Sequence, residues 1–211
     1  MNHSSEGPVQ RQDTAATRLR RFLHWRRRRL SAWCCRVSRG RCPRWLCCLF
    51  YRPPRYRPEL WNDEGRDAED CTCNLATETQ IQCKNNCYNY GVDDETDTFA
   101  QPGRAGGYTP SDITCDEYLK AARADGLVSI DCDKRCPKCC HKVALVIWPG
   151  VDFHWYRQDD NGNWSHKPGK TAARDRDDSD HPITDPRTAD RGPYTEFCGC
   201  FCVCKSRVTI Q

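Results

Sequence analysis

The sequence predicts a small α+β domain in which helices pack on an antiparallel sheet, preceded by a disordered basic tail. Residues 141–169 contain three short aromatic or apolar runs separated by turn residues, which is typical of neighbouring antiparallel strands. Residues 111–125 offer two capping candidates, Ser111 and Thr114, carry acidic residues in the first turn and are followed by Gly126. These start and stop signals predict a helix, which we expect to pack on the sheet.

Charge is unevenly distributed along the 211-residue chain, whose net charge is +4. No acidic residue occurs in residues 18–57, whereas residues 59–133 are rich in Asp and Glu. No run of about 18 apolar residues exists, which predicts no transmembrane helix. The short apolar run at residues 45–51 is followed by Arg and Pro instead of a small-residue cleavage site, which argues against a signal peptide.

The chain divides into a tail and a folded domain. Residues 1–17 are polar and lack periodicity, which predicts disorder. Residues 51–58 are rich in proline, which has no amide hydrogen and restricts the residue before it, so we expect a linker. We therefore predict a basic tail with its linker over residues 1–65 and a cysteine-rich α+β domain over residues 66–211.

The basic part of the tail, residues 18–57, combines arginines with tryptophans and two Cys-Cys pairs. It has three interpretations: a solvated tail, a segment that lies on an anionic membrane surface, and an arm that neutralises nucleic-acid phosphates. The paired cysteines favour the membrane over nucleic acid, because acylated cysteines would add an anchor. The candidate lipidation sites are Cys34, Cys35, Cys47 and Cys48.

Residues 143–148 form an apolar run that ends at a Pro-Gly pair and has the pattern of a buried strand. Two further strands follow at residues 153–158 and 163–166. They are joined across Asn161 and Gly162, which we expect to form a two-residue type I′ turn. Three histidines therefore lie on or beside one small sheet.

The period of two along a strand decides which side chains share a face. It places His154 on one face of its strand and Trp155 on the other. Counting outward from the turn pairs Gln158 with Ser165, so His154 does not lie directly opposite His166 unless the hairpin twists or carries a bulge. This offset weakens the case for a strict catalytic triad that includes both histidines.

Cys87 follows two asparagines and precedes a short aromatic segment. Asn is a good N-cap, so we expect Cys87 in the first turn of a short helix, where the helix dipole lowers a cysteine pKa and favours the thiolate. The alternative is a structural role, in which Cys83 and Cys87 pair with Cys71 or Cys73. Both interpretations are open at this point.

Two dense cysteine groups occur in the second half of the chain. The first has the density of a zinc knuckle, beside His141, and its candidate ligands are Cys132, Cys136, Cys139 and Cys140. The second, at residues 198–204, alternates four cysteines with other residues as a strand would, which predicts all four thiols on one face. These thiols could pack as small buried side chains, form disulfides with the first group, or share a metal ion with it.

Residues 167–195 are polar and rich in proline, which predicts a long surface excursion before the last strand. Its aspartates between Asp175 and Asp180 suggest a calcium loop. However, their spacing lacks the glycine and the terminal glutamate of an EF-hand. A solvated acidic loop is the better interpretation.

Three segments carry a family resemblance: NNCYNYG (residues 85–91), VALVIWPGVDFHWYRQDDNGNWSHKPGKT (residues 143–171) and ITDPRTADRGPYTEFCGCFCV (residues 183–203). They resemble a group of uncharacterised, mainly bacterial and phage-associated proteins. That group is similar in layout to the papain-like cysteine hydrolase superfamily, which includes NlpC/P60, CHAP and transglutaminase-like domains. The resemblance covers about residues 80–205 and implies a small papain-like α+β fold.

The resemblance also implies a Cys–His site. Cys87 would be the nucleophile and His154 the base, with His166 as the third member that orients the imidazole. His141 is the competing base, because NlpC/P60 domains carry a histidine at the head of the first strand after the helix. Asp185 is another candidate for the orienting residue.

Two functions from different classes follow. The first is a cysteine hydrolase or acyltransferase that acts on a peptide or amide bond. The second is a non-catalytic binding or structural module, stapled by disulfides or zinc and tethered to a membrane or polyanion by its basic tail. No cofactor is required, apart from a structural zinc ion in the second. The lack of a readable secretion signal favours a peripheral membrane or cytoplasmic protein, whereas the 18 cysteines favour a secreted one.

Overall fold

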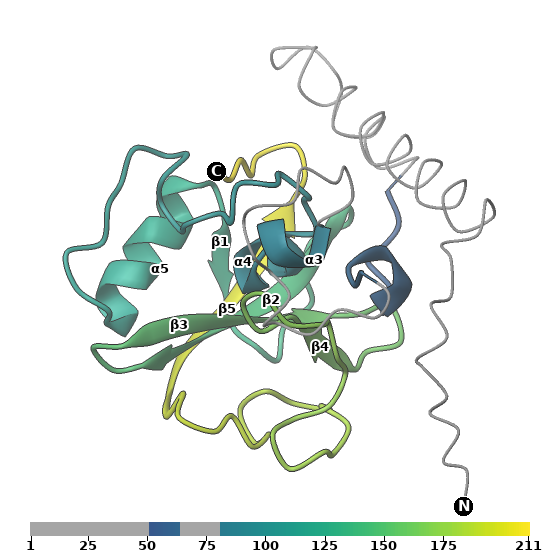
Figure 1. The fold of residues 1–211 in the computed structure, drawn as a ribbon. Coiled ribbons are helices and arrows are strands. Elements are labelled where there is room, and N and C mark those ends of the chain that lie inside the picture. The colour runs from purple at the N-terminus through teal and green to yellow at the C-terminus, as the bar shows by residue number, and fades with distance from the viewer. Residues whose placement is uncertain (1–50, 64–80) are drawn as a thin grey trace, which may run out of the picture.

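The protein, analysed as a computed structural model, is described over residues 51–63 and 81–211. Its elements are the 3-10 helix η1 (Pro58–Leu60), the helices α3 (Ile81–Lys84), α4 (Cys87–Val92) and α5 (Cys115–Ala124), and the strands β1 (Val128–Ile130), β2 (Cys140–Trp148), β3 (Asp152–Gln158), β4 (Trp164–His166) and β5 (Glu196–Cys204). The strands form one antiparallel sheet in the order β1-β5-β2-β3-β4. Helices α3, α4 and α5 lie on one side of this sheet, and the chain between β4 and β5 lies on the other (Figure 1). The predicted α+β class with an antiparallel sheet is confirmed.

Both helices that the sequence marked begin at capping residues. α4 begins after Asn86, whose side chain accepts two backbone hydrogen bonds from the first turn, so Cys87 is the first helical residue. α5 begins after Thr114, whose hydroxyl accepts a hydrogen bond from the amide of Glu117 at 3.5 Å. In each case the cap satisfies amide groups that have no partner inside the helix. The predictions of an asparagine cap and of the helix after Thr114 are confirmed.

The end of α5 is fixed by Asp125 and Gly126. Gly126 has a φ of +94°, and a Cβ on it would lie 2.4 Å from the carbonyl oxygen of Arg207, so the position requires glycine. The carboxylate of Asp125 accepts hydrogen bonds from the amides of Gly103 at 2.7 Å and Gly106 at 2.8 Å. The glycine-rich loop before α5 is therefore held against the end of the helix.

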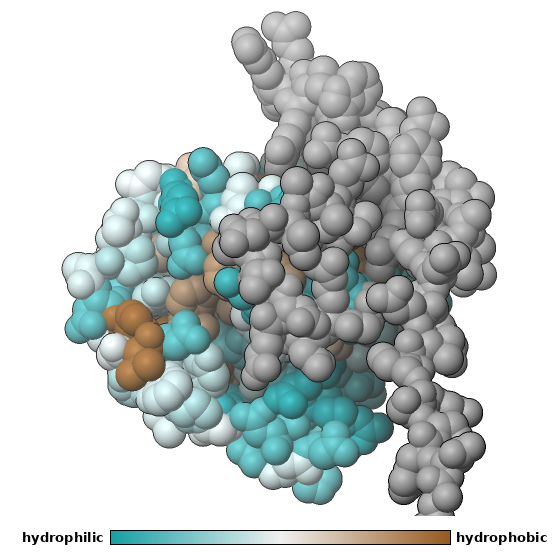
Figure 2. All heavy atoms as spheres, viewed as in Figure 1, coloured by the Kyte–Doolittle hydropathy of each residue, from teal (hydrophilic) through white to brown (hydrophobic). Residues whose placement is uncertain are grey.

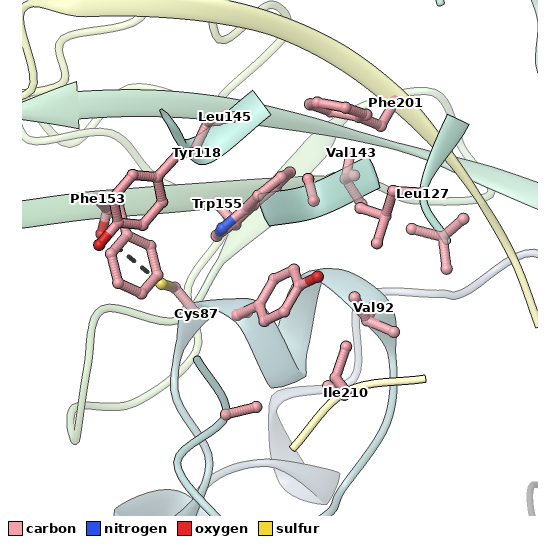
Figure 3. Packing of buried hydrophobic residues seen from close by; sticks show 14 of the residues in the cluster. Cys87, Val92, Tyr118, Leu127, Val143, Leu145, Phe153, Trp155, Phe201 and Ile210 are labelled. Atoms are coloured by element: carbon pink, nitrogen blue, oxygen red, sulfur yellow. Dashed lines mark hydrogen bonds between the residues drawn. The ribbon is translucent and has the colours of Figure 1, made fainter. Parts of the chain in front are cut away.

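The main core lies between the helices and the sheet (Figure 3). Alternation along β2, β3 and β5 turns every second side chain toward the helices. Members of this core are Cys87, Val92, Tyr118, Leu127, Val143, Leu145, Phe153, Trp155, Phe201 and Ile210. Trp155 lies in this core and His154 packs on the other face of β3, so the predicted division of β3 side chains is confirmed.

A second, smaller core lies on the opposite face of the sheet. Val146 of β2 and Tyr156 of β3 belong to it, and Ile183 from the chain between β4 and β5 covers them. The amide of Trp164 donates a hydrogen bond to the carbonyl of Ile183 at 2.8 Å. Residues 167–195 therefore cover this face of the sheet. The outer surface of this covering segment is hydrophilic (Figure 2).

The turn between β3 and β4 differs from the predicted type I′ turn. The amide of Asp159 bonds to the carbonyl of Asn163, and the amide of Gly162 bonds to the carbonyl of Asp159. Gly162 has a φ of +90°, whereas Asn161 does not have a positive φ. This pattern is that of a three-residue loop, in which a left-handed glycine follows a type I turn. The register moves by one residue, so Tyr156 lies opposite His166.

Strand β5 carries a bulge that the sequence alternation did not predict. Pairing with β2 shifts between Leu145 and Val146, which lie opposite Gly199 and Phe197 and leave Cys198 between them. Cys198 packs against the main core, whereas Cys200 belongs to the second core. The prediction that all four thiols share one face is wrong, because the bulge reverses the alternation.

Residues 51–63 pack onto the folded part of the chain. Leu60 and Trp61 are buried, and the Trp61 ring contacts the Tyr90 ring edge-on with 5.0 Å between centroids. The carbonyl of Pro54 accepts a hydrogen bond from the amide of Asp160 at 2.8 Å. This stretch of the predicted linker is therefore fixed to the domain.

Several predictions fall on residues 1–50 and 64–80, which lie outside the described residues. They concern the disordered start, most of the basic segment over residues 18–57, the domain boundary near residue 65, the proposed partners Cys71 and Cys73, and the lipidation sites Cys34, Cys35, Cys47 and Cys48. Within the described ranges, no helix has both the length and the apolar character needed to span a bilayer.

Candidate functional site

Cys87 is the free cysteine of the described residues, and it is buried. It opens α4 and points toward β3, where its Sγ lies 4.0 Å from the carbonyl oxygen of Phe153 (Figure 3). The start of α4 favours a thiolate, but this helix has six residues and a weak dipole. Burial outweighs that effect and raises the pKa of the Cys87 thiol to about 12. At neutral pH the sulfur is therefore a protonated, apolar part of the core.

Cys87 and His154 are not brought together. Phe153 and Trp155, the neighbours of His154 on β3, point into the core that holds Cys87. His154 points to the opposite face, where its ring packs against Tyr156 with 5.1 Å between centroids. Strand β3 thus separates the thiol from the imidazole, and this geometry provides no Cys–His proton transfer.

His154 and His166 do meet, because the shifted register places them diagonally on one face. Nε2 of His154 and Nδ1 of His166 are 2.7 Å apart, so one neutral ring donates a hydrogen bond to the other. Nε2 of His166 lies 3.0 Å from the carbonyl oxygen of Arg176. Burial lowers the pKa of His154 well below its usual value and that of His166 to about 4. The pair is therefore neutral at pH 7 and joins β3 to the chain after β4.

His141, the alternative base, is also fully engaged. Its Nε2 donates to the carbonyl of Gly91 at 2.8 Å, and its Nδ1 accepts from the Tyr51 hydroxyl at 3.0 Å. Burial lowers the pKa of His141 to about 3. Phe153, which contacts Cys87, pairs with Ile147, six residues beyond His141 on β2. Six strand residues span roughly 20 Å, so His141 lies at the far end of β2 from the thiol.

Asp185, the other candidate for the orienting residue, belongs to a different part of the molecule. Its carboxylate pairs with Arg187 at 2.6 Å, and Arg187 also pairs with Asp133 at 2.8 Å. The carboxylate of Asp185 is thus held by an arginine on its own loop.

The two cysteine groups are joined by disulfides. Three of them connect the loop before β2 and the first residue of β2 to β5, and we call this set the cystine ladder: Cys132–Cys200, Cys136–Cys202 and Cys140–Cys204. A fourth, Cys115–Cys198, ties α5 to the bulge of β5. Cys139 and Cys83 are disulfide-bonded as well. The zinc knuckle predicted at Cys132, Cys136, Cys139 and Cys140 is wrong, because these sulfurs are oxidised and a zinc ligand must be a thiolate. The alternative of bridges between the two groups is confirmed.

No family model matches the chain, and no solved structure matches it. A protein named insoluble matrix shell protein 1, from Ruditapes philippinarum, is 46% identical over 145 residues. The matched segment covers 69% of this chain and 86% of that protein. The chain belongs to the insoluble matrix shell protein 1 family.

This membership corrects the family expected from the sequence. The resemblance to bacterial and phage-associated papain-like hydrolases is wrong, because the family shown is that of a molluscan shell matrix protein. The segments behind the resemblance have other roles here. Cys87 packs in the main core, the His154 side chain lies on the other face of β3, and the cysteines of residues 198–204 are cross-linked.

Two buried cations, Arg157 and Lys167, hold parts of this fold together, and the sequence analysis identified neither as a key residue. The Arg157 guanidinium pairs with Asp159 at 3.0 Å and with Asp93 at 3.2 Å, and it lies 4.0 Å over the Tyr90 ring. Lys167 donates to three backbone carbonyls at 2.5 to 2.7 Å, and its burial lowers its pKa to about 7. The signal for Arg157 was available, because the strand period places it on the buried face with Trp155.

Proposed function

We propose that this chain is a non-catalytic structural protein of an insoluble extracellular matrix, in which the folded part is a rigid module cross-linked by disulfides. The observation that carries the proposal is the cystine ladder. The ladder supports a structural role because the cysteines that were candidate metal ligands form disulfide cross-links instead. The kind of matrix is suggested by the family, because its named member is an insoluble matrix shell protein.

The disulfides supply stability that a small sheet alone lacks. The four pairs join residues that are 64 to 83 positions apart. In the chain-entropy account, the first cross-link over such a span stabilises the fold by roughly 4 kcal/mol, and each later one adds less because it closes a shorter loop. They also require an oxidising compartment, which supports a secreted protein over a cytoplasmic one.

The basic tail gives the module a means of attachment. Residues 18–57 carry 14 arginines and no acidic residue. In an extracellular matrix the partner that suits this charge is a polyanion, because each arginine can pair with a carboxylate or sulfate group. The module would then be the rigid part and residues 18–57 the adhesive part of one protein.

The buried thiol argues against a hydrolase. An attacking sulfur must be ionised and reach a substrate, whereas Cys87 is 4% exposed and its pKa is raised. The histidines are neutral, buried and hydrogen-bonded to partners other than Cys87. A peptide or amide substrate has no path to a reactive pair in this arrangement.

Fractionation of the source tissue tests the proposal. Extracellular matrix and cell lysate are separated, the matrix is extracted with dilute acid and then denaturant, and each fraction is probed with an antibody to residues 81–211. The protein is expected in the insoluble matrix fraction and to be released by denaturant with a reductant. Recovery from the soluble lysate with reduced cysteines would contradict the proposal, as would amidase activity abolished by Cys87→Ala.

A further inference from the structure

Two of the described cysteines have disulfide partners outside the described residues. Cys83 lies in α3, Cys139 directly precedes β2, and both are disulfide-bonded. The four disulfides between described residues include neither of them, and the one other described cysteine, Cys87, is free. Their partners therefore belong to residues 1–50 and 64–80, whose cysteines are Cys34, Cys35, Cys42, Cys47, Cys48, Cys71 and Cys73.

The chain leaves and re-enters the described fold beside Cys83. The amide of Asp63 donates a hydrogen bond to Oε1 of Gln82, and the amide of Gln82 donates one to Oδ2 of Asp63, both at 3.1 Å. Cys71 and Cys73 belong to the sequence between these two residues. Closing a short loop costs less chain entropy than closing a long one, so one of this pair is the favoured partner of Cys83.

The other entry point of the chain lies beside Cys139. Tyr51 is the first described residue of its range, and its hydroxyl is 3.0 Å from Nδ1 of His141, two positions after Cys139. Cys48 and Cys47 precede Tyr51 by three and four positions, so the chain between them spans at most roughly 10 to 14 Å. A disulfide needs Cα atoms about 4.4 to 6.8 Å apart. The fixed position of Tyr51 therefore keeps both cysteines within reach of Cys139.

We propose that Cys139 forms a disulfide with Cys47 or Cys48, and that this bond fastens the arginine-rich segment to the start of β2. In forming it, two thiols of the chain lose two protons and two electrons as one S–S bond is made. A small-molecule or protein disulfide of the oxidising compartment takes up both by thiol–disulfide exchange and becomes two thiols.

This bond joins the basic segment to the cystine ladder. Eleven arginines lie within residues 18–46, before the two candidate cysteines. Cys140, the residue after Cys139, carries the ladder disulfide to Cys204. A force on the arginines then reaches the cross-linked sheet by a short covalent path, in parallel with the proline-rich linker. The inference rests on the proposed function, because it names how the adhesive segment is fastened to the rigid module.

Peptide mapping of the recombinant full-length protein, secreted in its oxidised form, tests the bond. Free thiols are alkylated, and the unreduced protein is unfolded and digested with trypsin. Cleavage after lysine and arginine, except before proline, produces the peptides of residues 45–55 and 139–142. The two peptides are expected in one cross-linked species by mass spectrometry, and a reductant should separate them.

Two serine variants show which sulfur carries the cross-link. Residues 139–142 contain both Cys139 and Cys140, and Cys139→Ser should lose the cross-link to residues 45–55 while keeping the one from Cys140 to Cys204. The matched control is Cys83→Ser, which removes the other cysteine whose partner lies outside the described ranges. It should leave the species that contains residues 45–55 and 139–142 unchanged.

The proposal is overturned if Cys139 is bonded to any cysteine other than Cys47 and Cys48, or if both of these are free or acylated in the wild-type protein. Survival of the cross-link in Cys139→Ser would also overturn it. If that variant does not fold, the double variant Cys47→Ser and Cys48→Ser decides, and there Cys139 should be recovered as an alkylated thiol. The mapping uses purified protein, so its failure would leave the matrix fractionation result untouched.

Discussion

Cys87 and His154 lie on opposite faces of β3. The sulfur contacts the carbonyl oxygen of Phe153 from the helix side, and the imidazole of His154 is 2.7 Å from His166 on the other side. Each group is satisfied where it lies, the thiol by apolar packing and the imidazole by a second imidazole. This relationship separates the two groups that a cysteine hydrolase would bring together, and it yields predictions that a hydrolase would not share.

Cys87→Ala should lower the stability of the folded protein. The substitution removes a buried sulfur from the main core, for which we expect a loss of about 1 to 2 kcal/mol in the free energy of unfolding. Denaturant unfolding measures this value. In the wild-type protein, the peptide that contains Cys87 should react with iodoacetamide in denaturant and hardly at all in buffer. Rapid labelling in buffer would mean that the thiol is exposed.

Stability should fall as the pH drops from about 6.5 toward 4. In the folded protein the pKa of His166 is lowered to about 4 from an ordinary value of 6.5, so the folded state disfavours the protonated ring. The stabilisation is complete above pH 6.5, where both states are neutral, and is lost as the unfolded state gains the proton. A shift of this size corresponds to roughly 3 kcal/mol, and His154 acts in the same direction.

Unfolding free energies at several pH values test this slope. His166→Gln should reduce the loss between pH 6.5 and 4. His181→Gln is the matched control, because that side chain is 76% exposed, and its slope should equal that of the wild-type protein. A wild-type stability that is flat over this range would show that the two imidazoles titrate normally.

Gly126→Ala should be among the most damaging single substitutions at a glycine. The new Cβ would lie 2.4 Å from the Arg207 carbonyl, on a backbone with φ at +94°. We expect a loss of about 3 kcal/mol or more. Gly150→Ala provides the comparison, since φ there is +71° and no atom lies within 4 Å, so only about 1 kcal/mol of backbone strain is expected. Equal losses of stability for the two variants in thermal unfolding would show that the contact with the Arg207 carbonyl oxygen adds no cost.

Arg157→Met should destabilise the fold by about 3 to 5 kcal/mol. The substitution leaves the carboxylates of Asp159 and Asp93 without their buried guanidinium and removes the contact over Tyr90. Arg55→Met, at a side chain that is 63% exposed, should cost less than about 0.5 kcal/mol. Denaturant unfolding of both variants measures the difference, and similar values would mean that Arg157 has little structural weight.

The sequence predicted the local elements well, because their signals are local. Asn86 and Thr114 cap the expected helices, and the alternation along β3 placed Trp155 and His154 on the correct faces. A strand pattern shows which side chains share a face, but not which face the helices cover, because that depends on tertiary packing. The predicted pairing of Cys87 with His154 was wrong for this reason.

The alternation of polar and apolar residues also did not predict two irregularities of one residue each, one in the β3–β4 loop and one in β5. An Asn-Gly pair suits both a two-residue and a three-residue loop, and the choice moved His166 opposite Tyr156. The bulge at Cys198 turned one cysteine of β5 toward α5 and left the next three for the ladder. Strand β1 was missed, since three residues carry too little periodicity to be recognised. Disulfide partners cannot be deduced from spacing alone.

Mass-spectrometric mapping of the cysteines in the native protein tests the account most directly. The protein is alkylated without reduction, digested, and analysed for cross-linked and free cysteine peptides. We predict the cross-links Cys132–Cys200, Cys136–Cys202, Cys140–Cys204 and Cys115–Cys198, with Cys87 free and unalkylated until the chain is unfolded. Free thiols at Cys132, Cys136 and Cys140, or a Cys87 that alkylates rapidly in the folded protein, would contradict the structural role proposed here.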